Sequence, residues 1–339
     1  MASRRGSPLK TIAARLGVSE ATVSRTLNNN AAVSPEMRKR VLDAYVDLYN
    51  SVPLATQTMI GMIVPDFSNP FFAELAFTFE RVLESDDQHL LVSSSEGRTE
   101  REILLLQRFR SIGVQGIIFI GATNQSEALL SLVSDGEPVV VLDRRLAAGN
   151  VDIVTTNSRK ATRAAVVDLA NKGHRRIGYL RGLAGTETAR ERFGSFVGAM
   201  KEIGLDTSPA WLFDGKYTAE SGADCARKLI DMTKAERPTA ILAGNDLMAI
   251  GLMQRLQEAE WRLPRDLSVV GFDDISWSRW TSPALTTIAQ PVETLVLESL
   301  RLLGRRMRMG SESTTRLQPE VVEIEPTLVR RDSVGPAKG

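Results

Sequence analysis

The sequence has a single cysteine, Cys225, so no disulfide can form within the chain. It has only two histidines, His89 and His174, and their spacing with Cys225 matches no metal-ligand pattern. It also has neither an apolar run of about 18 residues nor a signal-peptide pattern. These absences exclude a disulfide framework and a membrane span. They predict a cytoplasmic protein that carries no metal and no cofactor.

The motifs of common enzyme classes are missing as well. The chain contains no G-x-x-x-x-G-K-[ST] phosphate loop, no G-x-S-x-G elbow, no H-E-x-x-H and no glycine-rich dinucleotide turn after a strand. Asp273 and Asp274 are adjacent, so on an extended chain they point to opposite sides and do not flank one scissile bond. We therefore expect no enzymatic activity, and an enzyme acting on a sugar or nucleoside is kept as an alternative.

What is present is a long chain with an uneven charge distribution. Its 339 residues are too many for one ordinary hydrophobic core, so two or three domains are expected. The net charge is only +1, but residues 1–60 carry eight Lys/Arg against four Asp/Glu, a net +4 that the rest of the chain offsets. The positive end is the candidate for contact with nucleic acid.

Residues 9–28 predict two short helices joined by a turn. The first is indicated by apolar residues three or four apart: Leu9, Ile12, Ala13 and Leu16. Gly17 ends this helix, and Ser19 is placed to cap the next one. In the second helix Val23 and Leu27 point inward. Two helices around a glycine-containing turn are typical of a helix-turn-helix, although a solvated helical hairpin has the same spacing.

The stretch IAARLGVSEATVSRTLNN, followed by VSPEMRKRVLDA, resembles the head of the LacI/GalR family of bacterial transcription regulators. The resemblance implies that Glu20, Ala21 and Arg25 read bases. Arg25 can bridge guanine O6 and N7, and Ala21 can touch a thymine methyl. Glu20 can accept from cytosine, or it simply favours the helix N-terminus as an acid. The resemblance also implies phosphate contacts for Ser19, Thr22, Ser24 and Asn28.

A third helix and a short linker complete the N-terminal part. Ser34 and Pro35 predict the start of a helix, whose apolar stripe closes a head spanning residues 1–48: Val41, Leu42, Tyr45 and Leu48. The linker is predicted at residues 49–59, about six or seven residues shorter than the family pattern, or roughly two helical turns. Leu54 is the leucine available for insertion into the minor groove, and the short linker puts a normal hinge helix in question.

From residue 60 onward, short Val- and Ile-rich runs alternate with helical stretches. This pattern predicts a parallel sheet covered on both faces, and its repetition predicts an α/β core of two doubly wound lobes. Ligands of such sheets bind beyond the carboxyl ends of the strands, so two facing lobes would hold a ligand between them.

The core also resembles the LacI/GalR family, in the stretches IGMIVPDFSNPFFAEL, RPTAILAGNDLMAIG, PRDLSVVGFDDI and SPALTTIAQP. The resemblance implies a core like a periplasmic sugar-binding protein, with three crossings between lobes near Asn157, Gln290 and Pro319. The first lobe is then expected to contain residues 60–157 and about 291–318. The second is expected to contain residues 158–290 and about 319–331, including the strand VVEIE. A disordered tail is expected at residues 332–339.

Several polar residues fall at predicted strand ends, among them Asp143, Asn245 and Asp273. Carboxylates beside an arginine fork can bind vicinal hydroxyls through charge-assisted hydrogen bonds. The resemblance implies a polar clamp of Arg192, Asn245 and Asp273. It implies support from Asp143 and Arg144, and a ring-lining wall of Phe71, Phe72 and Tyr217. Alternatives remain open for three residues. Asp246 is as suited to cap the following helix as to touch the ligand, and Phe71 and Phe72 are alternatively core residues at the start of a helix.

We therefore expect an effector-responsive, sequence-specific DNA-binding regulator, a repressor of a carbohydrate-related operon. It would bind double-stranded operator DNA as a homodimer, because one small head buries too little surface to bind tightly alone. The effector is expected to be a sugar or sugar derivative, although the aromatic wall also resembles that of the purine repressor. The alternative is a cytoplasmic sugar or purine receptor with weak or no specific DNA binding.

Overall fold

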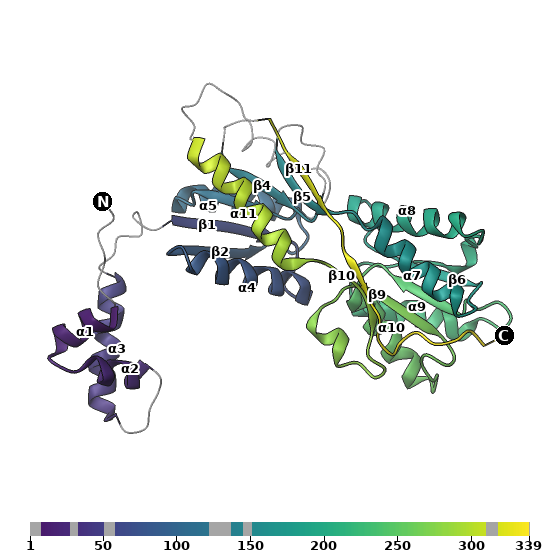
Figure 1. Ribbon diagram of the computed structural model, residues 1–339, viewed down its shortest axis with the longest axis horizontal. Coiled ribbons are helices and arrows are strands. Elements are labelled where there is room, and N and C mark those ends of the chain that lie inside the picture. Colours follow the sequence, from purple (N-terminus) through teal and green to yellow (C-terminus); the bar gives the residue numbers. More distant parts are fainter. Residues whose placement is uncertain are drawn as a thin grey trace. The chain divides into compact units, whose positions relative to one another are not determined.

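The computed structural model describes residues 8–27, 33–50, 58–121, 137–144, 151–309 and 318–338. The chain divides near Thr58 into two compact units, a helical head and an α/β core (Figure 1). Asn28 and Leu54, predicted to contact DNA, lie outside the described residues. The head helix that precedes the linker runs to Asn50 and the first core strand starts at Thr58, so the linker is shorter than the predicted 49–59.

The head consists of α1 (Pro8–Leu16), α2 (Glu20–Leu27) and α3 (Pro35–Asn50). Gly17 between α1 and α2 has a φ of +67°, a conformation that glycine adopts without steric cost. All three helices contribute to one small core: Ile12, Ala13, Val23, Val41 and Ala44. The inward prediction for Leu42 is wrong, since Leu42 is 44% exposed. Ala44 is buried instead, because it lies three residues after Val41 and therefore on the same face of the helix.

The first lobe of the core is built on a six-stranded sheet in the order β11-β5-β4-β3-β1-β2. Its strands are β1 (Thr58–Val64), β2 (Gln88–Ser94), β3 (Gly116–Phe119), β4 (Val139–Leu142), β5 (Asp152–Thr156) and β11 (Val321–Ile324). Its helices are α4 (Pro70–Glu84), α5 (Thr99–Ile112) and α11 (Val292–Met309).

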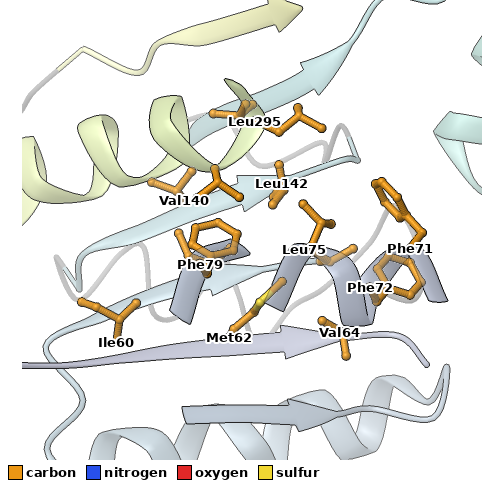
Figure 2. Packing of buried hydrophobic residues seen from close by; sticks show 14 of the residues in the cluster. Ile60, Met62, Val64, Phe71, Phe72, Leu75, Phe79, Val140, Leu142 and Leu295 are labelled. Carbon is orange, nitrogen blue, oxygen red and sulfur yellow. The ribbon is translucent and has the colours of Figure 1, made fainter. Parts of the chain in front are cut away.

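Side chains of successive strand residues point to opposite faces of this sheet. Ile60, Met62 and Val64 of β1 pack with residues of α4 and α11 (Figure 2). Ile63 packs on the other side, in a cluster with Phe109 of α5. A strand buried on both faces needs apolar residues throughout, which is why β1 reads as a continuous apolar run.

The second lobe repeats this architecture around the sheet β12-β10-β9-β8-β6-β7. Its strands are β6 (Ile177–Arg181), β7 (Leu212–Asp214), β8 (Ala240–Ala243), β9 (Ser268–Asp273), β10 (Thr286–Ala289) and β12 (Thr327–Val329). One face packs against α7 (Arg159–Asn171) and α8 (Glu187–Glu202). The other packs against α9 (Ala219–Asp231) and α10 (Asp246–Glu258). Strand β12 is antiparallel to β10, whereas the other recorded pairs are parallel.

The third crossing between the lobes does not lie near Pro319, and VVEIE does not belong to the second lobe. Val321–Ile324 forms β11, which pairs in parallel with β5 of the first sheet. The chain enters the second sheet only at Thr327, the start of β12. The physical reason is a hydrogen bond at the residue that precedes β11. The backbone N–H of Glu320 donates to the buried carboxylate of Asp152, which sets the register of β11 beside β5.

The expected disordered tail is also wrong, because residues 332–338 pack on the second lobe. The side chain of Ser333 is fully buried, and its hydroxyl donates to the carbonyl oxygen of Val269 over 2.6 Å. The Oγ atom of Ser333 in turn accepts the backbone N–H of Thr286 over 2.8 Å. Farther along, the N–H of Ala337 donates to the carbonyl of Lys172. Backbone hydrogen bonds order this segment although its small residues show no periodicity.

Candidate functional site

A cavity of about 310 Å³ opens between the lobes at the carboxyl ends of the strands. All residues predicted to bind the effector are among its lining residues: Phe71, Phe72, Asp143, Arg144, Arg192, Tyr217, Asn245 and Asp273. The first four come from the first lobe and the last four from the second. The cavity therefore has the mixed apolar and polar walls that a small-molecule site requires.

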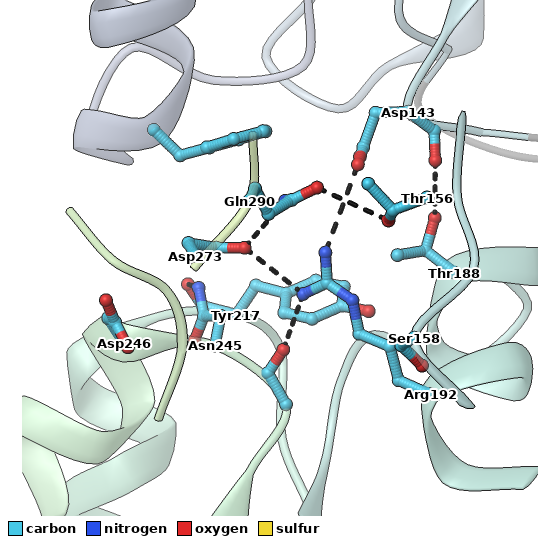
Figure 3. A network of polar contacts seen from close by, with 12 residues as sticks. Asp143, Thr156, Ser158, Thr188, Arg192, Tyr217, Asn245, Asp246, Asp273 and Gln290 are labelled. Carbon is cyan, nitrogen blue, oxygen red and sulfur yellow. Dashed lines mark hydrogen bonds and ion pairs between the residues drawn. The ribbon is translucent and has the colours of Figure 1, made fainter. Parts of the chain in front are cut away.

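Arg192 is the central charged residue of this cavity (Figure 3). Its Nη1 atom donates to the carbonyl oxygen of Gly244 over 2.7 Å and lies 3.4 Å from Oδ1 of Asp273. Its Nη2 atom lies 3.9 Å from Oδ1 of Asp143, in the other lobe. The guanidinium stacks 3.7 Å above the ring of Phe272. These contacts hold a planar cation in one orientation between two carboxylates.

Burial and neighbouring charges together determine the protonation of Arg192 and Asp273. Burial lowers the pKa of Arg192, but Asp273, Tyr217 and Asp143 outweigh burial and raise it, so the guanidinium stays charged. Burial raises the pKa of Asp273 to about 7, against the opposing effects of Arg192 and of a hydrogen bond from Gln290. The cavity therefore contains a fixed cation beside a carboxyl group that titrates near neutral pH.

Gln290 connects the polar network to the crossing segment between the lobes. Its Nε2 atom donates to Oδ1 of Asp273 over 2.8 Å. Its Oε1 atom accepts the hydroxyl of Thr156, at the end of first-lobe strand β5, over 3.4 Å. The sequence indicated Gln290 only as the site of a crossing, because nothing in its neighbours marks a buried amide. It joins Asp273 to the first lobe.

Tyr217 and Asn245 are fixed by each other and by the backbone. Asn245 Nδ2 donates to the carbonyl oxygen of Tyr217 over 3.1 Å, while Oδ1 accepts the N–H of Met248 and caps α10. Tyr217 has a φ of +65°, and its ring fills the space beside Gly182, where a Cβ atom would lie 2.0 Å from the ring. Positive φ values of non-glycine residues are costly, and they also occur at Asp143 and Asp273 of this cavity.

Asp246 does not cap α10, and it is not among the described residues that line the cavity. Its carboxylate accepts the hydroxyl of Thr287 over 2.5 Å and the N–H of Ile275 over 2.9 Å. Burial raises the pKa of Asp246 well above its ordinary value. Asn245, one residue earlier, is the cap of α10, and Asp246 instead joins α10 to β10 and to the segment after β9.

The aromatic wall lies at the start of α4. The rings of Phe71 and Phe72 meet edge to face with centroids 5.4 Å apart, and both side chains are buried and line the cavity. Asn69 caps this helix by accepting the N–H of Phe71, and Pro70 occupies its first turn. Further polar lining residues were missed because isolated polar residues in loops carry no pattern: Asp66, Asn69, Glu96, Thr188, Lys216 and Thr218.

In the head, the predicted DNA-reading side chains lie on the exposed face of α2. Glu20, Ala21 and Arg25 are exposed, and Thr22 and Ser24 are half-buried. Ser19 caps the helix, since its Oγ atom accepts the N–H of Thr22 over 3.1 Å. The Nε atom of Arg25 donates to the carbonyl oxygen of Ala21 over 3.1 Å, rather than to Glu20. This contact leaves the two terminal nitrogens of Arg25 at the surface of the helix.

Within the described ranges, no group of three or more His, Cys, Asp or Glu side chains is placed to hold a metal ion. No helix in those ranges is both long and apolar enough to cross a bilayer. The fold and the cavity define a two-lobed ligand-binding core joined to a helix-turn-helix head. Residues 166–334 match the periplasmic binding protein-like domain, and residues 8–48 match the bacterial regulatory proteins of the lacI family. The chain belongs to this LacI family of transcription regulators.

Known relatives are similar over almost the whole chain. The HTH-type transcriptional repressor PurR of Photobacterium profundum is 32% identical over 335 residues, which cover 96% of this chain and 98% of the relative. Catabolite control protein A of Priestia megaterium is 31% identical, over 92% of this chain and 96% of its own. The solved complex of the transcriptional regulator CelR with cellobiose has a TM-score of 0.72 and 26% identity, covering 97% of this chain and all of its own.

Proposed function

We propose that the protein is an effector-controlled repressor of a carbohydrate-related operon, which acts in the cytoplasm as a homodimer on a near-palindromic operator. The observation that carries this proposal is the cavity between the lobes, where buried charges and aromatic rings from both lobes converge. A ligand that touches both lobes can change their relative orientation. Through that change it would alter the affinity of the heads for DNA, which is an allosteric coupling between two sites.

We assign the effector to the sugars or sugar derivatives. Arg192 is balanced by Asp143 and Asp273, so the cavity offers paired donors and acceptors rather than an excess of one charge. Vicinal hydroxyls both donate and accept, and they suit such a set. The cellobiose complex of a regulator with the same fold supports this class. The effector contacts are assigned to Phe71, Phe72, Asp143, Arg144, Arg192, Tyr217, Asn245 and Asp273.

The aromatic wall favours a purine as the second candidate effector. The buried rings of Phe71 and Phe72, together with Tyr217, offer flat apolar surfaces on which a planar base can stack. A panel of ligands distinguishes the two candidates. Cellobiose, ribose and glucose are tested against hypoxanthine and guanine by thermal shift of the full-length protein. Stabilisation by a purine alone would replace the sugar assignment.

We assign base reading to Glu20, Ala21 and Arg25, and backbone contacts to Ser19, Thr22, Ser24 and Asn28, with Leu54 available for the minor groove. Two heads in a symmetric dimer would engage two half-sites, because the major groove admits one recognition helix per half-site. The test is selection of sites by the full-length protein from a random DNA pool at physiological salt. Enrichment of a palindrome with guanine in each half-site supports the regulator. No enrichment, with retention that falls as salt rises, would favour a receptor without specific DNA binding.

A further inference from the structure

A second cavity, of about 330 Å³, lies at the other end of the second-lobe sheet. Its lining residues include Arg176, Thr239 and Asp266, which come just before β6, β8 and β9. The cavity between the lobes lies at the carboxyl ends of these same strands. The two cavities therefore belong to opposite ends of one sheet, and a ligand in one does not occupy the other.

The second cavity is rich in positive charge. Its cationic lining residues are Arg176, Lys234, Arg237, Arg265 and Lys338, against two carboxylates, Glu260 and Asp266. Asp266 is engaged locally, since Oδ2 accepts the N–H of Arg262 over 2.7 Å and Oδ1 lies 3.7 Å from Nε of Arg265. Lys234 and Lys338 have no hydrogen-bond or ion-pair partner among the residues that the structure describes. The lining thus has an excess of cationic groups over local counter-charges.

Two arginines of this cavity, Arg237 and Arg176, are held in fixed orientations. Arg237 donates through Nε to the carbonyl of Met232 over 2.7 Å and through Nη2 to that of Ile230 over 3.0 Å. Its guanidinium lies 4.4 Å above the ring of Trp261. Among the described residues, Arg176 donates through its Nε atom alone, to the carbonyl of Arg237 over 2.9 Å. Both terminal nitrogens of Arg176 are left for another acceptor, at little further entropic cost.

The C-terminal segment forms one wall of the cavity. Pro336 and Lys338 are lining residues, and the backbone beside them is fixed by His174. One ring nitrogen of His174 bonds the carbonyl oxygen of Gly335 over 3.0 Å, and the other bonds the hydroxyl of Thr239 over 2.8 Å. Burial lowers the pKa of His174, so this anchor is neutral at pH 7. The ordered tail therefore turns a group of surface cations into a walled cavity.

We propose that this cavity binds a small anion with a phosphate monoester, at a site separate from the effector cavity. Fixed guanidinium groups and lysine ammonium groups are the usual partners of phosphate oxygens, which accept several charge-assisted hydrogen bonds. A volume of about 330 Å³ suits a metabolite of modest size. The proposal does not depend on the identity of the effector.

The test is isothermal titration calorimetry of the full-length protein with glycerol 3-phosphate, inorganic phosphate and, as the uncharged counterpart, glycerol. Saturable binding of the two phosphates and none of glycerol is expected. The double variant Lys234→Gln/Lys338→Gln weakens that binding about tenfold, because two cations that face the anion are lost. Lys201→Gln/Lys228→Gln is the matched control, with the same charge change on exposed helical residues of the same lobe, and it changes binding less than twofold.

Three results would overturn the proposal. Equal weakening in both double variants would mean a general effect of net charge. Loss of phosphate binding in Asn245→Ala, with no loss in Lys234→Gln/Lys338→Gln, would put the phosphate in the effector cavity. Binding of a non-specific DNA duplex, without binding of glycerol 3-phosphate, would mean that the cations contact a nucleic-acid backbone.

Discussion

The backbone N–H of Ser276 donates to Oε1 of Glu74 over 2.7 Å, and this hydrogen bond joins the two lobes. Glu74 lies on α4 of the first lobe, and Ser276 follows β9 of the second. Beside it, Leu247 and Ile275 of the second lobe belong to the large hydrophobic cluster of the first. A charge-assisted contact and an apolar contact thus hold the lobes together on the α4 side of the cleft.

Glu74→Ala is expected to lower the free energy of unfolding by about 2 kcal/mol, because the N–H of Ser276 loses a charged acceptor in a half-buried position. Urea unfolding of the full-length protein measures the change. Glu80→Ala is the control, since Glu80 is an exposed residue of the same helix without a partner among the described residues. Its effect should stay within about 0.5 kcal/mol. Equal losses in the two variants would show that the bond to Ser276 contributes nothing.

Asp273 should make stability depend on pH. Its pKa is about 7 in the folded chain and 3.8 when unperturbed, so the folded state holds the proton more tightly. The stabilisation that this bound proton gives the folded state is complete below about pH 4 and is lost as the pH rises through 7. Between about pH 4 and 7, the free energy of unfolding of the wild type should fall by on the order of 4 kcal/mol relative to that of Asp273→Asn. The reason is that one pKa unit corresponds to about 1.4 kcal/mol.

Chemical unfolding at pH 4, 5, 6, 7 and 8 measures the difference in unfolding free energy between the two proteins, which should level off above pH 8. Asp206→Asn changes an exposed carboxylate of the same lobe and is expected to run parallel to the wild type. Parallel curves for Asp273→Asn and the wild type would contradict the raised pKa.

Gly182→Ala should displace the ring of Tyr217 and thereby damage the effector cavity. A Cβ atom at position 182 would lie 2.0 Å from Cζ of Tyr217, so the ring or the backbone must move, at a cost of about 1–3 kcal/mol. Effector binding by thermal shift should fall at least tenfold. In Gly198→Ala the new methyl on α8 meets no atom within 4 Å, and that variant should be neutral or more stable. Unchanged effector binding in Gly182→Ala would show that Tyr217 is not a contact.

Arg25→Gln should reduce affinity for the selected operator by about 10- to 100-fold and relax the preference for guanine, since a bidentate base contact is worth about 1–3 kcal/mol. Fluorescence anisotropy with the selected site and a scrambled duplex separates specific from non-specific binding. Lys201→Gln removes an exposed charge from the core and serves as the control. A proportional loss on both duplexes would make Arg25 a backbone contact.

Periodicity predicted the alternating core and the three head helices, because buried strands and amphipathic helices leave their pattern in the residues themselves. Strand β1 illustrates this: Ile60, Met62 and Val64 are buried on one face of the sheet and Ile63 on the other, so the strand is an apolar run. The placement of VVEIE failed because register is a long-range property. Pairing of Val321 with Ile153 depends on partners about 170 positions away, which no local pattern reveals.

The sequence predicted residues that line the cavity, but it did not predict the contacts between them. Asp143, Asn245 and Asp273 were found because they follow apolar strands, and parallel strands end at one edge. Gln290 was not found, because its importance arises only when Asp273 and Thr156 approach it from two lobes. The positive φ values of Asp143 and Tyr217 were not predicted either, because the surrounding structure imposes this strained backbone and the residue type does not indicate it.

The placement of β11 and β12 has a consequence for synthesis on the ribosome. Each of these strands completes the edge of a different sheet, and both follow all the other strands of the two sheets in chain order. Neither sheet can acquire its edge strand until residues 321–329 have been translated. The head, in contrast, is complete after Asn50. During translation a nascent chain can therefore carry a folded head while both lobes still lack an edge strand.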